Sequence, residues 1–118
     1  MFHSVSDDRR RHKRFLVKGQ AVLRTPAGVS GDKVDEVDEV INVSAGGLLV
    51  LSKIPPRVGT DVETRFAIQG YNTEIHARGR IIRTEIGLAG ISFLEEPEGL
   101  QALMAWLEAG LIADFLSP

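Results

Sequence analysis

Apolar residues fall on alternate positions in several short segments of this chain, and turn-forming glycines and prolines separate the segments. Side chains of a β-strand point alternately to its two faces, so a period of two predicts strands with one buried face. The segments lie at 15–25, 37–43, 48–51, 61–68, 73–83 and 88–94. Short strands with tight turns between them predict an all-β domain, built as an antiparallel barrel or sandwich.

The same alternation predicts which side chains face the core. Residues expected to share an inward face are Phe15, Val17, Gly19, Ala21 and Leu23 in the first segment, Val62, Phe66 and Ile68 in the fourth, and Ile75, Ala77, Gly79 and Ile81 in the fifth. In the second segment Val37, Ile41 and Val43 share one parity, so we expect them on one face. The apolar run 48–51 is expected to be core throughout.

The period changes after Pro97 and Gly99. Apolar residues then recur every three or four positions, at Leu100, Leu103, Met104, Leu107, Leu111, Ile112 and Phe115. This spacing predicts an amphipathic helix over 99–116. Its apolar face would cap the open end of the barrel or form a homodimer contact, and the two uses are compatible. Trp106 lies off the stripe, where it would extend the buried face or lie at an interface.

Length and composition limit the class of protein. A chain of 118 residues, 43% hydrophobic and 25% charged, predicts a single domain over 1–118 with one core. The chain has no cysteine, which excludes disulfides, thiolate zinc sites and cysteine catalysis. The apolar runs are far shorter than the roughly 20 residues of a membrane span, so we expect no membrane insertion and a cytoplasmic location.

The formal net charge of -2 hides an uneven distribution. The segment 9–14 holds five of the 14 cations, which leaves the rest of the chain with 9 cations against 16 acids. We therefore expect a flexible basic arm over 1–13 on an acidic barrel over 14–96. Arg10 and Arg14 are four residues apart, about 13 Å in an extended chain. Guanidinium groups at that spacing suit phosphates and guanine edges, although a solvated arm that attracts polyanions non-specifically would look the same.

A second cluster follows at 42–47. Asn42 and Ser44 are two residues apart on a predicted strand, so their side chains leave the same face and offer both donors and acceptors. Gly46 and Gly47 remove side-chain bulk and permit a positive φ, so a ligand can approach the backbone. The alternative is an ordinary Asn/Ser/Gly turn that closes a hairpin.

The two clusters together resemble the motifs of the PilZ domain family. Its Arg-x-x-x-Arg motif is matched at 10–14, and its (Asp/Asn)-x-Ser-x-x-Gly motif at 42–47. The order of the motifs is that of the family, and the resemblance covers essentially the whole chain. It implies a six-stranded antiparallel barrel with a C-terminal helix, and a non-catalytic receptor for cyclic di-GMP.

By this resemblance Arg10 and Arg14 would bind phosphates and guanine edges, and Asn42 and Ser44 would hydrogen-bond the ligand. Gly46 and Gly47 would let it lie close. Arg9, directly before the first motif, implies a stacked pair of ligands. The arm would become ordered on binding and signal to an unknown downstream partner.

Two other functions remain open from the sequence. One is an adaptor that has the PilZ fold but ignores nucleotide and works through the helix. The other is a barrel that binds nucleic acid through the arm, which the acidic body and the lack of an aromatic platform disfavour. We expect no enzyme activity, no cofactor and no metal site. Arg78 and Arg80 are expected at the surface. The alternative is that one of them lines the ligand face.

Overall fold

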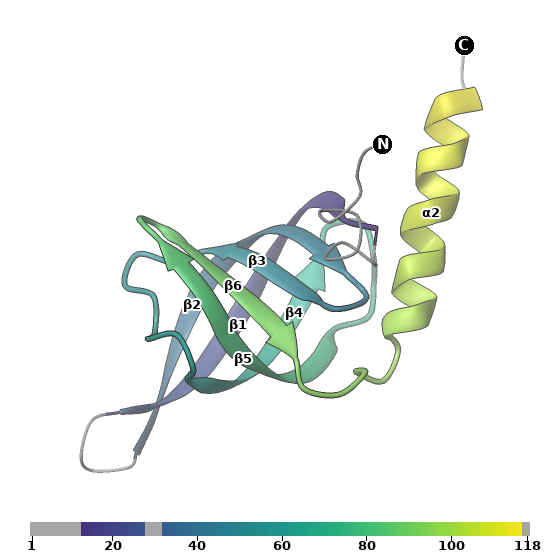
Figure 1. Ribbon diagram of the computed structural model, residues 1–118. Coiled ribbons are helices and arrows are strands. Elements are labelled where there is room, and N and C mark those ends of the chain that lie inside the picture. Colours follow the sequence, from purple (N-terminus) through teal and green to yellow (C-terminus); the bar gives the residue numbers. More distant parts are fainter. Residues whose placement is uncertain (1–12, 28–31, 117–118) are drawn as a thin grey trace, which may run out of the picture.

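The computed structural model describes residues 13–27 and 32–116 and contains six strands and one helix. The elements are β1 (Phe15–Ala27), β2 (Asp32–Ser44), β3 (Gly47–Leu51), β4 (Asp61–Ile68), β5 (Ile75–Glu85), β6 (Leu88–Phe93) and α2 (Leu100–Leu116). The strands curve around a common interior, and α2 stands at one side of them (Figure 1).

The strands form a closed barrel in the order β1-β2-β3-β6-β5-β4, and every pair is antiparallel. The predicted six-stranded antiparallel barrel with a C-terminal helix is therefore confirmed. Strand β3 pairs with β6 and not with β4, so the segment 52–60 crosses one end of the barrel. Closure removes the exposed sheet edges that promote edge-to-edge association.

The predicted inward faces of three strands are confirmed. In β4, Val62, Phe66 and Ile68 are buried, and Thr64 is buried between them. In β5 and β1 the same alternation buries the predicted residues Ile75, Ala77, Ile81, Ala21 and Leu23. Phe66 also stacks on Phe93 of β6, with ring centroids 6.1 Å apart. These side chains fill the barrel and make the core.

The predicted face of β2 is wrong. Val37 is 64% exposed, whereas Val40 and Val43 are fully buried. The pairing of β2 with β3 shifts register between Val40 and Asn42, which is a β-bulge. The extra residue reverses the parity of the strand, so a single alternating pattern does not hold along it. The run 48–51 is likewise not core throughout, because Leu48 and Val50 are buried and Leu51 is exposed.

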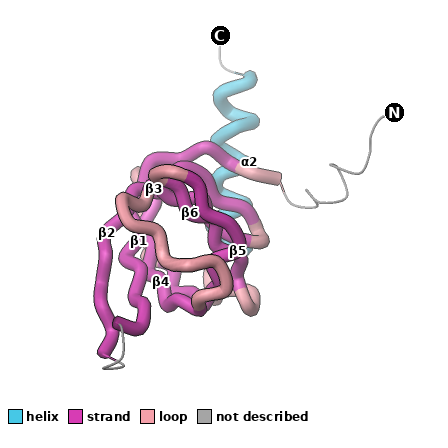
Figure 2. Tube along the Cα trace, turned by 60° about the vertical axis from the view of Figure 1, so that its left-hand side comes forward, coloured by secondary structure: helices cyan, strands magenta, loops and turns pink. Residues whose placement is uncertain are grey.

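Among its described side chains, α2 packs against the core through its first turns. It begins directly after Gly99, whose φ of 85° suits glycine, and its Leu100 and Leu103 are buried in the core. Met104 and Leu107 pack against the core, but Leu111 is 53% exposed. Figures 1 and 2 agree that the C-terminal half of α2 projects beyond the barrel. The predicted apolar stripe therefore caps the barrel as far as Leu107, and the side chains of Ile112 and Phe115 lie outside the described ones.

Trp106 anchors the side of α2 on the turn between β4 and β5. Its ring lies 5.1 Å from that of Tyr71, and it covers Gly70, where a Cβ would lie 3.4 Å from the indole. The indole remains 41% exposed. Within the described ranges, no helix is both long and apolar enough to cross a membrane.

Candidate ligand-binding site

The turn between β2 and β3 is held rigidly against β6. The Ser44 Oγ accepts a hydrogen bond from the Gly46 N–H at 3.1 Å. The Gly46 carbonyl in turn accepts one from the Phe93 N–H at 2.8 Å. The Ser44 hydroxyl proton is not used in either bond, so this hydroxyl can still donate to a ligand.

This turn forms one wall of a groove of about 510 Å³ on the outer surface of β3, β6 and β5. The size is within the usual range for small-molecule sites. The groove is lined by Arg14, Ser44, Ala45, Gly46, Gly47, Leu48, Leu49, Ile82, Arg83, Gly90, Ile91, Ser92, Phe93, Glu95 and Glu96.

The structure brings part of the predicted site together in this groove. Arg14, just before β1, lies at the same groove as Ser44, Gly46 and Gly47, although about 30 residues separate the two motifs. The barrel makes this contact possible, because β1 pairs with β2 and places Phe15 opposite Val43.

Three other predicted residues are not in this set. Arg9 and Arg10 lie outside the described residues. Asn42 is half-buried between its cross-strand neighbours Leu16 and Leu49, and it does not line the groove. The β2–β3 register is regular from Asn42 to Ser44 and Val43 between them is buried, so both side chains leave the outer face, as the spacing predicts, but only Ser44 lines the groove.

Gly47 has a structural reason to be glycine. A Cβ at this position would lie 2.0 Å from the carbonyl oxygen of Ile91, which no side chain can do without moving β6. Neither Gly46 nor Gly47 uses the positive φ that glycine permits, because the described glycines with positive φ are Gly59, Gly70, Gly87 and Gly99. The glycine therefore permits β3 and β6 to approach each other.

Arg83 is a groove residue that the sequence pattern did not identify. Its parity places it with the buried Ile75 and Ile81, but the pairing of β5 with β6 shifts register between Ile81 and Arg83. The bulge turns both Ile82 and Arg83 outward. Opposite Arg83 is Gly90, where a Cβ would lie 3.2 Å from the Arg83 Cγ, so glycine lets the arginine stem cross β6.

The charges of the groove favour an anion. Among the described residues, neither Arg14 nor Arg83 has an ion-pair partner. At the rim, Glu95 accepts a hydrogen bond from the Arg78 Nε at 2.8 Å, and Glu96 accepts one from Gln101. One rim carboxylate therefore has a cation of its own, while the charges of the two groove arginines are not paired by any described carboxylate.

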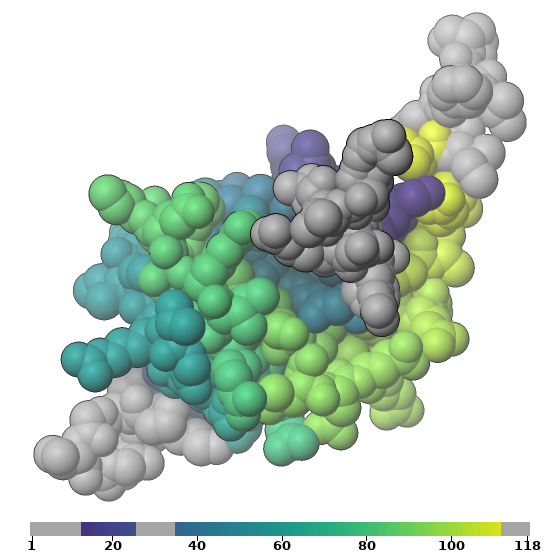
Figure 3. Space-filling view, in the orientation of Figure 1, coloured from purple at the N-terminus to yellow at the C-terminus, as the bar shows by residue number. Residues whose placement is uncertain are grey.

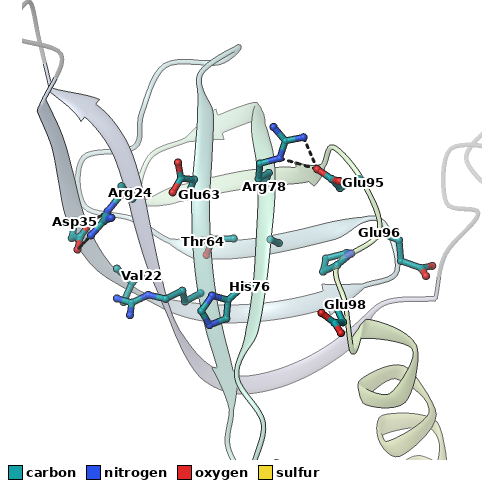
Figure 4. A pocket seen from close by; sticks show the side chains of 13 residues that line it. Val22, Arg24, Asp35, Glu63, Thr64, His76, Arg78, Glu95, Glu96 and Glu98 are labelled. Carbon is teal, nitrogen blue, oxygen red and sulfur yellow. Dashed lines mark hydrogen bonds and ion pairs between the residues drawn. The ribbon is translucent and has the colours of Figure 1, made fainter.

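A larger hollow of about 640 Å³ lies on the outer face of β1, β4 and β5 (Figure 4). Two of its three arginines are already paired: Arg24 donates to Asp35 at 2.7 Å, and Arg78 donates to Glu95, while Arg65 is the third. The bond from Arg24 lowers the pKa of Asp35 below its usual value. No described residue of the two predicted motifs lines this hollow. The groove beside the β2–β3 turn is therefore the better candidate.

Arg78 and Arg80 lie at the surface, as expected, and neither lines the groove. Arg80 donates to Asp61 at 2.7 Å, which lowers the pKa of that carboxyl. In the part of the chain that the structure describes, no group of three or more His, Cys, Asp or Glu side chains is arranged to hold a metal ion.

The fold and the groove define a small β-barrel domain with a candidate ligand site on its outer surface. The sequence profile of the PilZ domain matches residues 8–109, which is most of the chain. The chain therefore belongs to the PilZ domain family. PilZ domains are binding and adaptor modules whose common ligand is cyclic di-GMP.

Solved structures support the same fold. The chain is similar to the PilZ domain of CeSA from a cellulose-synthesizing bacterium, with a TM-score of 0.58 and 19% identity over 82% of this chain and 96% of that one. It is also similar to the Bacillus subtilis inhibitor of motility MotI/DgrA, with a TM-score of 0.63 and 16% identity over 92% of this chain. The match spans 52% of that second protein. No curated protein matches the sequence.

Proposed function

We propose that this PilZ domain is a non-catalytic receptor that binds cyclic di-GMP in the groove beside the β2–β3 turn. The observation that carries the proposal is the convergence of Arg14 with the Ser44–Gly47 turn in one groove. Two motifs that are remote in the sequence meet there, and together they supply a guanidinium and a hydroxyl that suit a phosphate.

The groove offers chemistry for each part of such a ligand. Arg14 and Arg83 would pair with its phosphates or with the O6/N7 edge of guanine. The Ser44 hydroxyl would donate its unused proton to a ligand oxygen. Leu49 and Ile82 provide apolar surface beside these groups, which a base can cover. Arg83 thus joins the residues that the family motifs assign.

The arm would complete the site. Arg9 and Arg10 would close over the ligand, with Asn42 at the edge of the site. Arg9 supports a second, stacked ligand molecule and a ratio of two ligands per chain. Lys13 lies between the motif arginines and forms an ion pair with Glu108 of α2, with Nζ and Oε1 2.9 Å apart. A change in the arm on binding would therefore reach α2, where a downstream partner can detect it.

Isothermal titration with cyclic di-GMP tests the proposal. The wild-type chain should bind with two ligands per chain, and Arg14→Ala should weaken binding by about tenfold or more, the usual cost of losing a charge-assisted contact. Arg57→Ala is the matched control, since Arg57 is an exposed arginine that does not line the groove. Absence of wild-type binding, or equal affinities of the wild type and Arg14→Ala, would reject the assigned site.

A further inference from the structure

The outward face of α2 is unusually apolar for a helix at a protein surface. Among its described side chains, residues 100–111, Glu108 is the only charged one, and Lys13 pairs with it. Leu100 and Leu103 are buried in the barrel core, so they do not belong to the face of α2 that points away from the barrel. That face consists of Gln101, Ala102, Ala105, Trp106, Ala109 and Gly110, all exposed.

A solvent-facing side of a helix normally carries charged or polar residues, and a helix that is apolar on all sides is normally buried. Here α2 lies on one flank of the molecule (Figures 1 and 3), and in Figure 1 its C-terminal half projects away from the strands. The barrel therefore covers one side of the helix only. The side of α2 that faces away from the barrel is left for another molecule to bury.

We propose that a second copy of this chain covers the outward face, so that two α2 helices pair in a symmetric dimer. The face is self-complementary in shape. Ala102, Ala105, Ala109 and Gly110 allow two helix backbones to approach closely, and the exposed part of Trp106 can fill the space over the small residues of the other copy. In a two-fold dimer each patch meets its own copy, so this combination of small and large residues satisfies itself.

Charge also favours a second copy at this place. Outside 9–14 the chain has 9 cations and 16 acids, so two copies gain nothing by bringing the acidic parts of their surfaces together. The outward face of α2 has no charged side chain among the described residues and avoids that repulsion. The interface differs from the apolar stripe of Leu103, Leu107 and Leu111 that the sequence suggested, because the barrel already takes the first part of that stripe.

The dimer should be weak. A helix of 17 residues is about 25 Å long. One helix face from each copy gives an interface at the small end of specific protein contacts. Association should therefore depend on concentration across the micromolar range, and it should not require cyclic di-GMP.

Sedimentation equilibrium of the full chain between about 10 and 500 µM tests the proposal, with the range chosen to span weak association. The average mass of the wild type should rise toward twice the monomer mass. Ala109→Arg should raise the dimer dissociation constant at least tenfold, and Ala105→Arg should repeat the effect. Ile86→Arg is the control, because Ile86 is a fully exposed apolar residue at the β5–β6 turn, away from α2. Circular dichroism would verify that each variant is folded.

A cross-link provides a second measurement, because the chain has no cysteine of its own. Ala109→Cys should form a disulfide-linked dimer under mild oxidation, and Ile86→Cys should form far less. A wild type that remains monomeric at 500 µM would overturn the proposal and leave the face to a different partner. Association that Ala109→Arg does not weaken would overturn it too, since the contact would then lie elsewhere.

Discussion

The buried carboxyl group of Asp38 should make the stability of this domain fall as the pH rises. Asp38 is 6% exposed, and its Oδ2 has no hydrogen-bond partner among the described residues. Burial, together with the adjacent Glu36, raises the pKa of Asp38 to about 7. Ser52 donates to Glu36 at 2.9 Å. The Asp38 carboxyl is therefore still protonated in the folded chain at a pH where an exposed carboxyl is ionised.

The raised pKa of Asp38 determines in which direction the stability changes with pH. A folded-state pKa above the ordinary 3.8 means that the folded chain binds this proton more tightly than the unfolded chain does. The stabilisation is complete below about pH 4 and is lost as the pH rises to about 7. The slope is about 1.4 kcal/mol per pH unit, so the total reaches about 4 kcal/mol as an upper limit.

Asp38→Asn removes the ionisable group and keeps the shape, and its amide can donate to Glu36. At pH 8 the variant should exceed the wild type in free energy of unfolding by about 2–4 kcal/mol, and at pH 4 the two should be nearly equal. The pKa of Asp35 and of Asp61 is lowered by arginine partners, so these groups act below pH 4 and cancel in the comparison.

Urea unfolding at pH 4, 6 and 8, followed by circular dichroism, measures these differences. Glu39→Gln is the matched control, since Glu39 is an exposed carboxylate next to Asp38 on β2. It should give no comparable change with pH. If the difference between Asp38→Asn and the wild type were the same at all three pH values, Asp38 would be ionised throughout and the reasoning would fail.

Three further outcomes are expected. Gly47→Ala forces a Cβ against the Ile91 carbonyl and should lower the free energy of unfolding in urea by about 1–3 kcal/mol. Gly110→Ala has open space around it in α2 and should raise the free energy of unfolding by up to about 1 kcal/mol. Equal effects of the two variants would contradict this reasoning. Arg83→Ala should weaken cyclic di-GMP binding by about tenfold in calorimetry with an unchanged melting temperature, and unchanged affinity would remove Arg83 from the site. Leu103→Ala, at a fully buried position, should cost about 2–5 kcal/mol in the same unfolding assay, and a loss below 1 kcal/mol would mean that α2 is not docked in solution.

The regular parts of the fold could be predicted because local periodicity determines them. The predicted strand 61–68 matches β4, and the helix predicted over 99–116 is α2. The bulges could not be predicted in this way. A single inserted residue reverses every later side chain of a strand, and nothing in the composition of β2 or β5 marks the shift near Asn42 or Ile82.

The residues of the candidate site also fall into two groups, those that the sequence predicted and one that depends on a bulge. Motif spacing identified Arg14 and the turn from Ser44 to Gly47, which meet in the groove. Arg83 enters the groove only because a bulge turns it outward opposite Gly90, and this depends on pairing between β5 and β6. The closely spaced glycines around β6 were the available signal, since a strand that carries glycine often has another group lying across it.

The strand order also determines when the groove can exist as the chain is made. Arg14 is near the start of the sequence, but the opposite side of the groove comes from β5 and β6, about 70 residues later. Strand β1 does not obtain its second neighbour until β4 has been added, and the barrel closes only with β6. Such non-local pairing is slow to form. A nascent chain that ends before β6 therefore has neither a closed barrel nor a groove. The chain would be able to bind its ligand only after the barrel has been synthesised and folded.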